Sequence, residues 1–573
     1  MPLPRRLASP VLLLALLCCT GSPRPAVDAA PVDAGPPALP EAEPNDAQEQ
    51  ALLLERDGEV SAGLSVTPGK QDVDWYVLAS PTPRVARVEV TAIPGADVAV
   101  ELYDAAGARR ATVDGQGEGQ PELLPNLGVS GKAWLKVLSL KKGSGGAYAV
   151  KVRFEAPLSG VEQEPDDRAA DAVLLGLGSP ARGYLSHGAD EDWYRLELPV
   201  PAAPAVDAGE DGGAEADGGE PAGAAPRALK LELSGVEGVR HELSLLSEAE
   251  AVLFSAKGRA GEGLAVRNVG LRPQDAVVYL VVRSLPLGSG KEVRRGSNPA
   301  QGYALTATLE EGGADAELEP NDTLERATQV AAEGERHGFL SPASDVDLYA
   351  VELPEGRLLR AKLSGVEGVD LQLSLVTEAS DGGEQELLRA NEGGEKEPER
   401  LSNVACAGTC YVRVSGVARK VDGSWVKDQE SADRPYTLSL STVADDGTAE
   451  REPNDDAAHA GTLRPGQSMR GTVYPRKDVD LFRVDLADRP VKTQLVATMT
   501  GVLKVDVALF LHRQEADGTR TLVQSSDRAK GDKPEAIRYA AEPGTYLLEV
   551  RDSRQRESNF QDGYVLRLEE GQE

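Results

Sequence analysis

The residues of this chain best placed to do chemistry are carboxylates, and they recur in one pattern four times. Each copy begins with Glu-x-Glu-Pro, then Asn or Asp, then Asp, and continues to an Asp-x-Asp pair before an apolar or aromatic segment. The second Glu and the first Asp of the pair are 29 residues apart in the first copy and 26 apart in the other three. Copies begin more than 100 residues apart, which indicates tandem domains, because solenoid repeats are about 20 to 50 residues long.

Each copy holds a set of oxygen ligands that fits calcium. Calcium prefers about six to eight hard oxygen ligands. A copy offers five carboxylates and one Asn side chain, or six carboxylates in the second copy, where Asp166 stands in place of Asn. Alternate residues of a strand share one face, so both members of an Asp-x-Asp pair can point at one ion. Crowded together without a cation, these acids would repel one another and their pKa values would rise.

We therefore predict a calcium site in every copy. The candidate ligands are Glu41, Glu43, Asn45, Asp46, Asp72 and Asp74 in the first; Glu162, Glu164, Asp166, Asp167, Asp190 and Asp192 in the second; Glu317, Glu319, Asn321, Asp322, Asp345 and Asp347 in the third; and Glu450, Glu452, Asn454, Asp455, Asp478 and Asp480 in the fourth. The alternative is that Glu-Pro-Asn-Asp is a capped turn that opens a domain and that Asp-x-Asp is the solvated entry of a strand.

The four motifs divide the chain into modules, each of which we predict to be an antiparallel β-sandwich. Module 1 covers residues 41–155, module 2 residues 160–310, module 3 residues 315–443 and module 4 residues 449–569. Stretches such as residues 229–246 alternate apolar and polar residues and contain Gly turns, which is typical of short strands in sandwiches. Residues 200–227 of module 2 form a low-complexity insertion, which we expect to be a disordered extension of a hairpin loop.

Composition argues against several classes of function. The formal charge of −32 repels nucleic acids and anionic lipid headgroups. The five histidines include no His-Glu-x-x-His pattern, and no Ser or Cys lies in a recognisable nucleophile motif. The acids recur in four modules, which fits a structural ion better than one active site. We therefore expect that the protein is not an enzyme.

The N-terminus has the order of an export signal. Arg5 and Arg6 precede the apolar run 11–17, which is too short to span a bilayer. The Leu-Leu-Cys-Cys sequence resembles the lipobox of bacterial lipoproteins, which implies residues 1–18 as a lipoprotein signal peptide and lipid on Cys19; an ordinary signal peptide is the alternative. Residues 19–40, rich in Pro, Ala and Asp, are expected to be a disordered tether. The lipid would be the chain's only contact with a membrane.

Two more cysteines, Cys406 and Cys410, flank the sequence Ala-Gly-Thr. In an exported protein a local disulfide is the expected state of such a pair. Closing so short a loop removes little entropy from the unfolded chain, so we expect a stabilisation near the low end of the usual range.

The repeated motifs carry a family resemblance. The opening Glu-Pro-Asn-Asp, the Asp-x-Asp-aromatic strand and the late Gly544-Thr545-Tyr546 strand resemble the bacterial pre-peptidase C-terminal domain, a family related to the collagen-binding domains of clostridial collagenases. The resemblance covers nearly all of residues 41–569. It implies a secreted, jelly-roll-like β-sandwich in which calcium ligands come from the opening acidic segment and the Asp pair. Members usually accompany a peptidase domain, and this sequence shows none.

These patterns lead to one hypothesis and one alternative. The hypothesis is a non-enzymatic lipoprotein of the bacterial cell envelope whose calcium-stabilised modules bind or display an extracellular or periplasmic protein or polysaccharide. Thr20, rather than Asp, follows Cys19, which resembles sorting to the outer membrane. The alternative is an accessory protein that binds a secreted peptidase or its substrate in trans.

Overall fold

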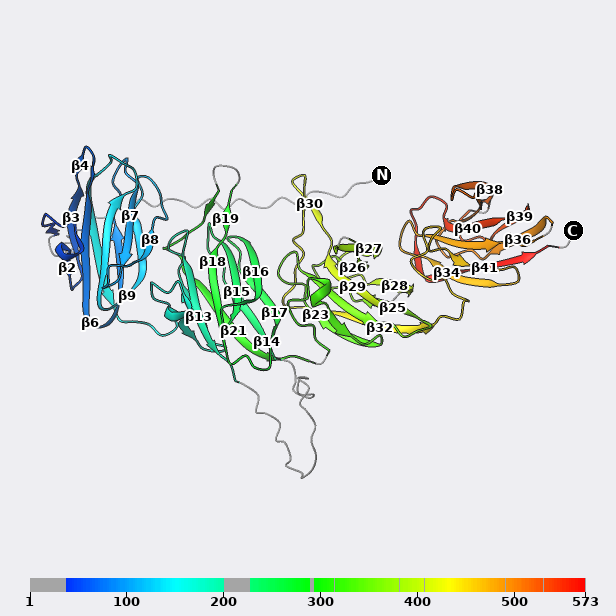
Figure 1. Ribbon diagram of the computed structural model, residues 1–573, viewed down its shortest axis with the longest axis horizontal. Coiled ribbons are helices and arrows are strands. Elements are labelled where there is room, and N and C mark those ends of the chain that lie inside the picture. The colour runs from blue at the N-terminus through cyan, green and yellow to red at the C-terminus, as the bar shows by residue number, and fades with distance from the viewer. Residues whose placement is uncertain are drawn as a thin grey trace, which may run out of the picture.

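Nearly all regular structure in this chain is β-strand, so the expected all-β class is confirmed (Figure 1). The computed structural model describes residues 38–199, 227–288, 293–313, 315–380, 382–406, 408–489, 491–528 and 530–571. The described helices are single 3-10 turns, namely η1 (Gln48–Gln50), η2 (Ala169–Asp171) and η4 (Leu324–Arg326). None of the helices in these ranges is long and apolar enough to cross a membrane. The predicted signal peptide, Cys19, almost all of the tether and almost all of the insertion lie outside the described residues.

Modules 2, 3 and 4 share one strand order, with a sheet of five strands and a sheet of four. In module 2 these are β11 (Val173–Leu175), β13 (Glu191–Glu197), β18 (Val277–Ser284), β15 (Arg240–Ser247) and β16 (Val252–Ala260), and then β12 (Ala181–Gly183), β21 (Tyr303–Glu311), β14 (Arg227–Leu233) and β17 (Leu264–Leu271).

Modules 3 and 4 repeat this order strand for strand. Module 3 contains β22 (Thr328–Val330), β24 (Val346–Glu352), β29 (Thr409–Gly416), β26 (Leu371–Glu378) and β27 (Glu384–Ala390), and then β23 (Gly334–Gly338), β32 (Tyr436–Ala444), β25 (Arg357–Leu363) and β28 (Glu399–Val404). Module 4 contains β33 (Gly461–Thr462), β35 (Val479–Asp485), β40 (Thr545–Asp552), β37 (Val507–Gln514) and β38 (Arg520–Ser526), and then β34 (Ser468–Val473), β41 (Asn559–Glu570), β36 (Thr493–Met499) and β39 (Glu535–Ala541).

Module 1 joins the same positions into one sheet of eight strands, because two of its strands are 18 residues long. The path is β1 (Leu39–Pro40), β3 (Gly58–Leu64), β10 (Gly146–Glu155), β6 (Val73–Val90), β9 (Glu122–Ser139), β7 (Val98–Tyr103) and β8 (Arg109–Val113), with β2 (Leu52–Leu54) beside β6. Three small hairpins complete the strands: β4 (Val66–Thr67) with β5 (Lys70–Gln71), β19 (Pro286–Leu287) with β20 (Arg294–Arg295), and β30 (Arg419–Val421) with β31 (Ser424–Val426).

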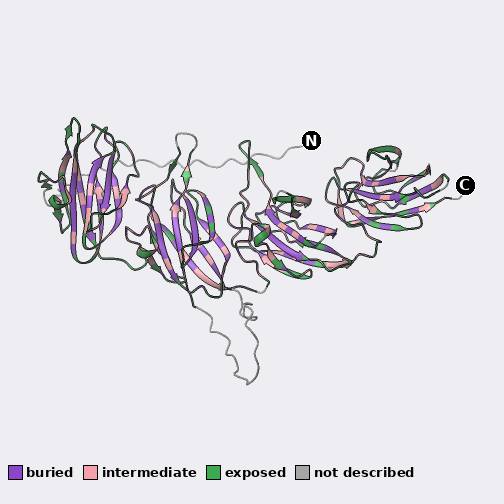
Figure 2. Ribbon diagram, in the orientation of Figure 1, coloured by how far each residue is buried: buried purple, intermediate pink, exposed green. Residues whose placement is uncertain are grey.

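Each module has its own apolar core, and strands from both layers of the module contribute buried residues to it (Figure 2). In module 2, for example, Leu196 of β13 and Leu231 of β14 belong to one cluster of buried residues. Burial alternates along strands such as β14, since successive side chains point to opposite faces. The module boundaries remain a prediction, and some ladders extend one or two residues beyond them, at Leu39, Glu311, Ala444 and Glu570. The groups of strands follow one another in chain order along the long axis of Figure 1.

Candidate metal centres

The opening motif of a module lies against its Asp-x-Asp strand because backbone hydrogen bonds join the two segments. In module 1 the Trp75 N–H donates to the Asn45 carbonyl at 3.0 Å. The equivalent bonds in modules 3 and 4 are both 3.2 Å long and run from Leu348 to Asn321 and from Leu481 to Asn454. The Glu-Pro peptide bond of the motif is cis in all four modules. Acids from two distant stretches of sequence therefore meet at one place in each module.

Acids from these segments form groups in which one carboxylate oxygen of each residue lies within 4.8 Å of one oxygen of every other member. Module 1 has one such group, and modules 2 and 3 each have two groups that share one Glu. The groups are Glu41, Glu43 and Asp74; Glu162, Glu164 and Asp166; Glu164, Asp190 and Asp192; Glu317, Glu319 and Asp347; and Glu319, Asp322 and Asp345. In module 4, Glu450, Glu452, Asp478 and Asp480 are all buried. Such groups supply the hard oxygen ligands that calcium prefers.

Many of these buried oxygens have no partner. In module 2 both carboxylate oxygens of Asp166 are buried and accept no hydrogen bond within the described residues. The same holds for one oxygen each of Glu319 and Glu452, and for the side-chain oxygens of Asn45 and Asn454. Burying an unpaired carboxylate is costly, and these oxygens are free of protein donors among the described residues and therefore available as ligands for a cation.

Burial raises the pKa values of the acids, and their mutual repulsion adds to the effect. Burial raises the pKa of Asp74 to about 8, although a hydrogen bond from Tyr148 opposes the rise. Burial likewise raises the pKa of Asp347 to about 7 and that of Asp480 to about 6. For Glu450, burial and then the charge of Asp480 raise the pKa well above its ordinary value. A divalent cation at the centre would reverse this tendency by favouring the ionised carboxylates.

A pair of tyrosines closes three of the sites, and sequence reasoning missed its role. The paired hydroxyls are Tyr76 and Tyr148 at 2.8 Å, Tyr194 and Tyr303 at 2.8 Å, and Tyr349 and Tyr436 at 2.6 Å. The hydroxyl of the second tyrosine in each pair donates to the second Asp of the Asp-x-Asp pair. In module 4 Phe482 takes the first position and leaves Tyr564 without this partner. The repeated tyrosines are visible in the sequence, but nothing in their spacing shows that the two hydroxyls meet.

Not every predicted ligand faces the centre of its site. Asp46 forms an ion pair with Lys70 at 2.8 Å near the surface, and Asp72 accepts a hydrogen bond from the Ser65 N–H. Asp455 accepts from the Val479 N–H at 3.1 Å, as expected for a turn-capping residue. The turn alternative therefore fits Asp455, whereas buried oxygens without partners occur on other acids, such as Asp166, Glu319 and Glu452.

Module 2 differs from the other modules by a buried histidine beside its acids. The His187 Nδ1 lies 3.4 Å from Asp190 Oδ2. Burial alone lowers the pKa of His187, but Asp190 outweighs this effect and the pKa is raised. Asp190 also accepts from the Ser186 hydroxyl at 3.0 Å. Module 2 thus has one more carboxylate than the others and a histidine whose protonation Asp190 favours.

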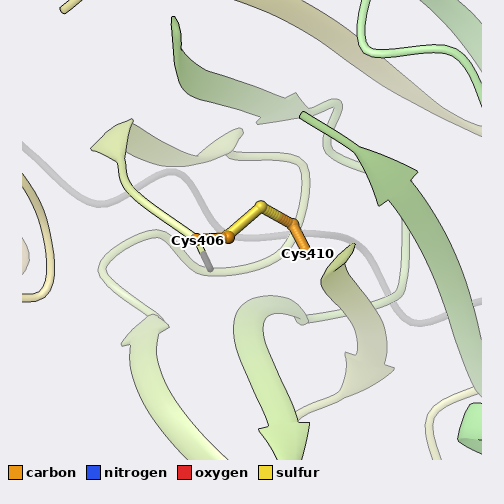
Figure 3. The surroundings of a disulfide bond; sticks show 2 residues. All are labelled: Cys406 and Cys410. Carbon is orange, nitrogen blue, oxygen red and sulfur yellow. A yellow bond between two sulfur atoms is a disulfide. The ribbon is translucent and has the colours of Figure 1, made fainter. Parts of the chain in front are cut away.

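The two later cysteines form a disulfide in module 3 (Figure 3). The Cα atoms of Cys406 and Cys410 are 5.6 Å apart. Cys410 lies in the apolar core, and Cys406 packs against it. The bond closes the turn between β28 and β29, just after the end of β28.

Comparisons with known proteins give only distant similarity. No family model and no curated protein matches the chain. Among solved structures, the chain is similar to the pre-peptidase C-terminal domain of collagenase from Bacillus anthracis, with 14% identity and a TM-score of 0.16 over 19% of this chain and 94% of that one. The CUB1-EGF-CUB2 domains of human MASP-1/3 and rat MASP-1 match with 10% identity over 42% of this chain and 100% and 99% of theirs, with TM-scores of 0.14 and 0.13. Similarities this weak say nothing about function.

Proposed function

We propose that this chain is a non-enzymatic lipoprotein of a bacterial cell envelope, in which four calcium-stabilised β-sandwich modules bind or display an extracytoplasmic partner. One observation carries the proposal: buried carboxylate or amide oxygens without partners occur at the same place in all four modules. A repeated site of this kind suits a structural ion, since a catalytic site has no need of four copies.

Calcium is the ion whose chemistry fits the ligands best. The ligand groups named above for modules 1, 2 and 3 consist entirely of Glu and Asp carboxylates. Hard oxygen ligands select calcium or magnesium, and calcium accepts the larger and less regular ligand sets. An extracytoplasmic location, which the N-terminal sequence favours, would expose the sites to millimolar calcium of the kind that extracellular modules bind.

We assign modules 2, 3 and 4 to the jelly-roll-like β-sandwiches because in each of them two sheets supply one shared core. Module 1 is assigned with them because its strands occupy the same positions, although they form one continuous sheet. A β-solenoid, the other all-β architecture to consider, would continue parallel strand pairing from one repeat into the next. Between neighbouring described modules, pairing is limited to single parallel bridges, which join Leu127 to Glu164, Val269 to Glu319 and Val404 to Glu452. Within modules 2, 3 and 4 the long strands pair antiparallel.

Thermal unfolding with calcium and with chelator tests the cation site. In the Asp347→Asn variant a neutral amide replaces a carboxylate that is fully buried. We expect the variant to lose the calcium-induced rise of Tm that belongs to module 3, and to be more stable than the parent in chelator because repulsion is relieved. The exposed Asp433→Asn is the matched control and should behave as the parent does. If calcium leaves the parent's Tm unchanged, the cation sites are wrong.

Mass spectrometry of the mature protein tests the lipid anchor. We expect a lipid-modified N-terminus on Cys19 that is lost in Cys19→Ser and kept in Cys18→Ala. An unmodified chain cut elsewhere in the first residues would exclude the anchor while leaving the cation sites intact.

A further inference from the structure

The acidic motif of modules 2, 3 and 4 is held by a strand of the module before it. In module 2 the Glu164 N–H donates to the Asn126 carbonyl at 3.1 Å, and the Gly128 N–H donates to the Glu164 carbonyl at 2.8 Å. The same pair of bonds joins Glu319 to Asn268 and Gly270 at 2.8 and 2.9 Å, and Glu452 to Asn403 and Ala405 at 3.0 and 2.8 Å. In these three modules the backbone of the second Glu is therefore hydrogen-bonded to a strand of the preceding module.

The receiving strand has a recognisable form in modules 1, 2 and 3. Its Asn lies at a β-bulge, where the strand register shifts, and Gly or Ala follows two residues later. Asn268 and Asn403 have φ values of 55° and 51°, a left-handed conformation that Asn adopts more readily than most residues. A Cβ on Gly270 would lie 3.2 Å from the Glu319 carbonyl oxygen, so only a small side chain fits there.

Module 4 provides an internal comparison, because its equivalent strand lacks these features. In β39 only Arg538 lies between Ile537 and Tyr539, where the corresponding strands of modules 2 and 3 have two residues, the second of which is Asn. Leu495, Val496 and Ala497 of β36 pair with Tyr539, Arg538 and Ile537 in an unbroken register. The bulge and the Asn thus occur in the three modules whose strand receives a motif, and not in module 4.

Covering by the preceding module changes the environment of the second Glu. Glu164, Glu319 and Glu452 are 4%, 4% and 3% exposed, whereas Glu43 of module 1 is exposed to solvent. Each of the three covered residues also has at least one carboxylate oxygen without a hydrogen-bond partner within the described residues. The second Glu is therefore buried in the three modules whose motif pairs with a preceding module, and exposed in module 1.

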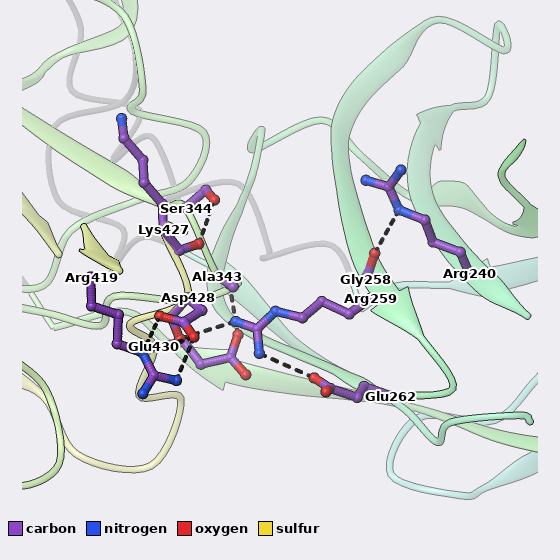
Figure 4. A network of polar contacts seen from close by, with 10 residues as sticks. All are labelled: Arg240, Gly258, Arg259, Glu262, Ala343, Ser344, Arg419, Lys427, Asp428 and Glu430. Carbon is purple, nitrogen blue, oxygen red and sulfur yellow. Dashed lines mark hydrogen bonds and ion pairs between the residues drawn. The ribbon is translucent and has the colours of Figure 1, made fainter. Parts of the chain in front are cut away.

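Side chains extend each junction beyond the motif. Figure 4 shows the junction of modules 2 and 3, where the Arg259 guanidinium donates to the Asp428 carbonyl at 3.0 Å. Close by, Arg267 of module 2 donates to the Ala432 carbonyl at 2.9 Å. At the next junction Tyr474 of module 4 packs into the core of module 3 and donates to Glu399 at 2.9 Å. Side-chain hydrogen bonds therefore join neighbouring modules in addition to the backbone bonds of the motif.

We propose that the bulged Asn strand is a docking surface for the acidic motif of the next module, and that a cation bound at the three covered sites fixes the angle between neighbouring modules. The inference rests on the proposed cation sites and assigns them a second role. Binding one ion then orders ligands in one module and, through the backbone of the second Glu, the strand of another. The uncovered site of module 1 stabilises its own module only.

Small-angle X-ray scattering and amide hydrogen exchange of the purified protein test this coupling. With calcium we expect the scattering of a rod of fixed shape. With chelator we expect the profile of a flexible string of modules, and at least tenfold faster exchange at the Gly270 and Glu319 amides. Gly270→Leu should give this loosened state at the junction of modules 2 and 3 even with calcium. Ala540→Leu, on an exposed position of β39, should not.

The outcomes separate this inference from the proposed function. If calcium raises Tm but leaves scattering and junction exchange unchanged, the coupling is wrong and the cation sites stand. If calcium changes neither, both are overturned. Should Gly270→Leu fail to fold, Gly128→Leu probes the junction of modules 1 and 2 in the same way, because a Cβ there would lie 3.3 Å from the Glu164 carbonyl oxygen.

Discussion

The Tyr436 hydroxyl donates a hydrogen bond of 2.7 Å to Asp347 Oδ2, and both residues are fully buried. The tyrosine comes from the last strand of module 3 and the aspartate from its Asp-x-Asp strand. This bond therefore ties the acidic site to the closure of the module's two sheets. It also gives Asp347 Oδ2 a hydrogen-bond donor from within the protein.

The first prediction concerns this bond. Tyr436→Phe should lower the free energy of unfolding by about 1 to 3 kcal/mol, because a buried carboxylate loses its donor. Chemical denaturation with calcium present measures the loss. Tyr349→Phe is the matched control and should cost less, since module 4 already carries Phe482 at the equivalent position. Equal costs for the two variants would contradict the role given to Tyr436.

Gly338 gives a second prediction. A Cβ at this position would overlap Glu317 and the Tyr436 hydroxyl, so Gly338→Ala should displace a candidate ligand and reduce the calcium-induced rise of Tm. Overpacking of this kind costs about 1 to 3 kcal/mol. Gly394→Ala, where a Cβ meets nothing within 4 Å, should leave the calcium response intact. An unchanged response in Gly338→Ala would place the ion elsewhere.

The third prediction is a pH dependence that calcium suppresses. Burial raises the pKa of Asp74 to about 8 and that of Asp347 to about 7, so the folded state without cation retains protons that the unfolded state has released. Its stability should therefore fall as pH rises from about 6.5 to 8.5. Calcium competes with these protons, so the fall should be smaller when calcium is present.

Differential scanning calorimetry in chelator and in calcium, at both ends of this range, measures the effect. Burial lowers the pKa of His241 to about 4, which lies below this range. Burial also lowers the pKa of His187, but Asp190 outweighs burial and the pKa is raised, so loss of this proton adds to the fall in stability. A Tm in chelator that rises with pH would contradict the assigned pKa shifts.

The fourth prediction concerns the disulfide of module 3. Replacing Cys406 and Cys410 with Ala should cost about 2 kcal/mol from the entropy of the unfolded chain, the value expected for a loop of about five residues. Ala405, whose N–H donates to Glu452, precedes the disulfide directly. We therefore also expect faster amide exchange at the junction of modules 3 and 4, but not at that of modules 2 and 3. Unchanged exchange at both junctions would show that the disulfide acts only within its module.

Sequence periodicity was sufficient to predict the all-β class, because alternation along strands such as β14 is a local property. The meeting of Glu41 and Glu43 with Asp74 followed from a spacing that repeats between modules. Sequence reasoning did not anticipate the tyrosine pairs, since a hydroxyl that reaches across two sheets depends on how the module closes. The ion pair of Asp46 with Lys70 is likewise a tertiary contact.

The covering of Glu164, Glu319 and Glu452 by a preceding module could not be read from one motif at a time. It required the pairing of a motif with a strand of a different module. The Asn at this strand was present in the sequence in three modules, whereas the fourth has only Arg538 between Ile537 and Tyr539. The sequence alone does not show that the backbone of this Asn accepts a hydrogen bond from the second Glu of the next module.

Direct measurement of bound calcium tests the central claim most directly. Equilibrium dialysis of the purified protein, followed by metal analysis, should find at least one calcium ion per module, and fewer in Asp347→Asn than in the Asp433→Asn control. Binding of no calcium above the level of the dialysis buffer, with the protein folded, would contradict the account, because the buried acids would then be held without a cation.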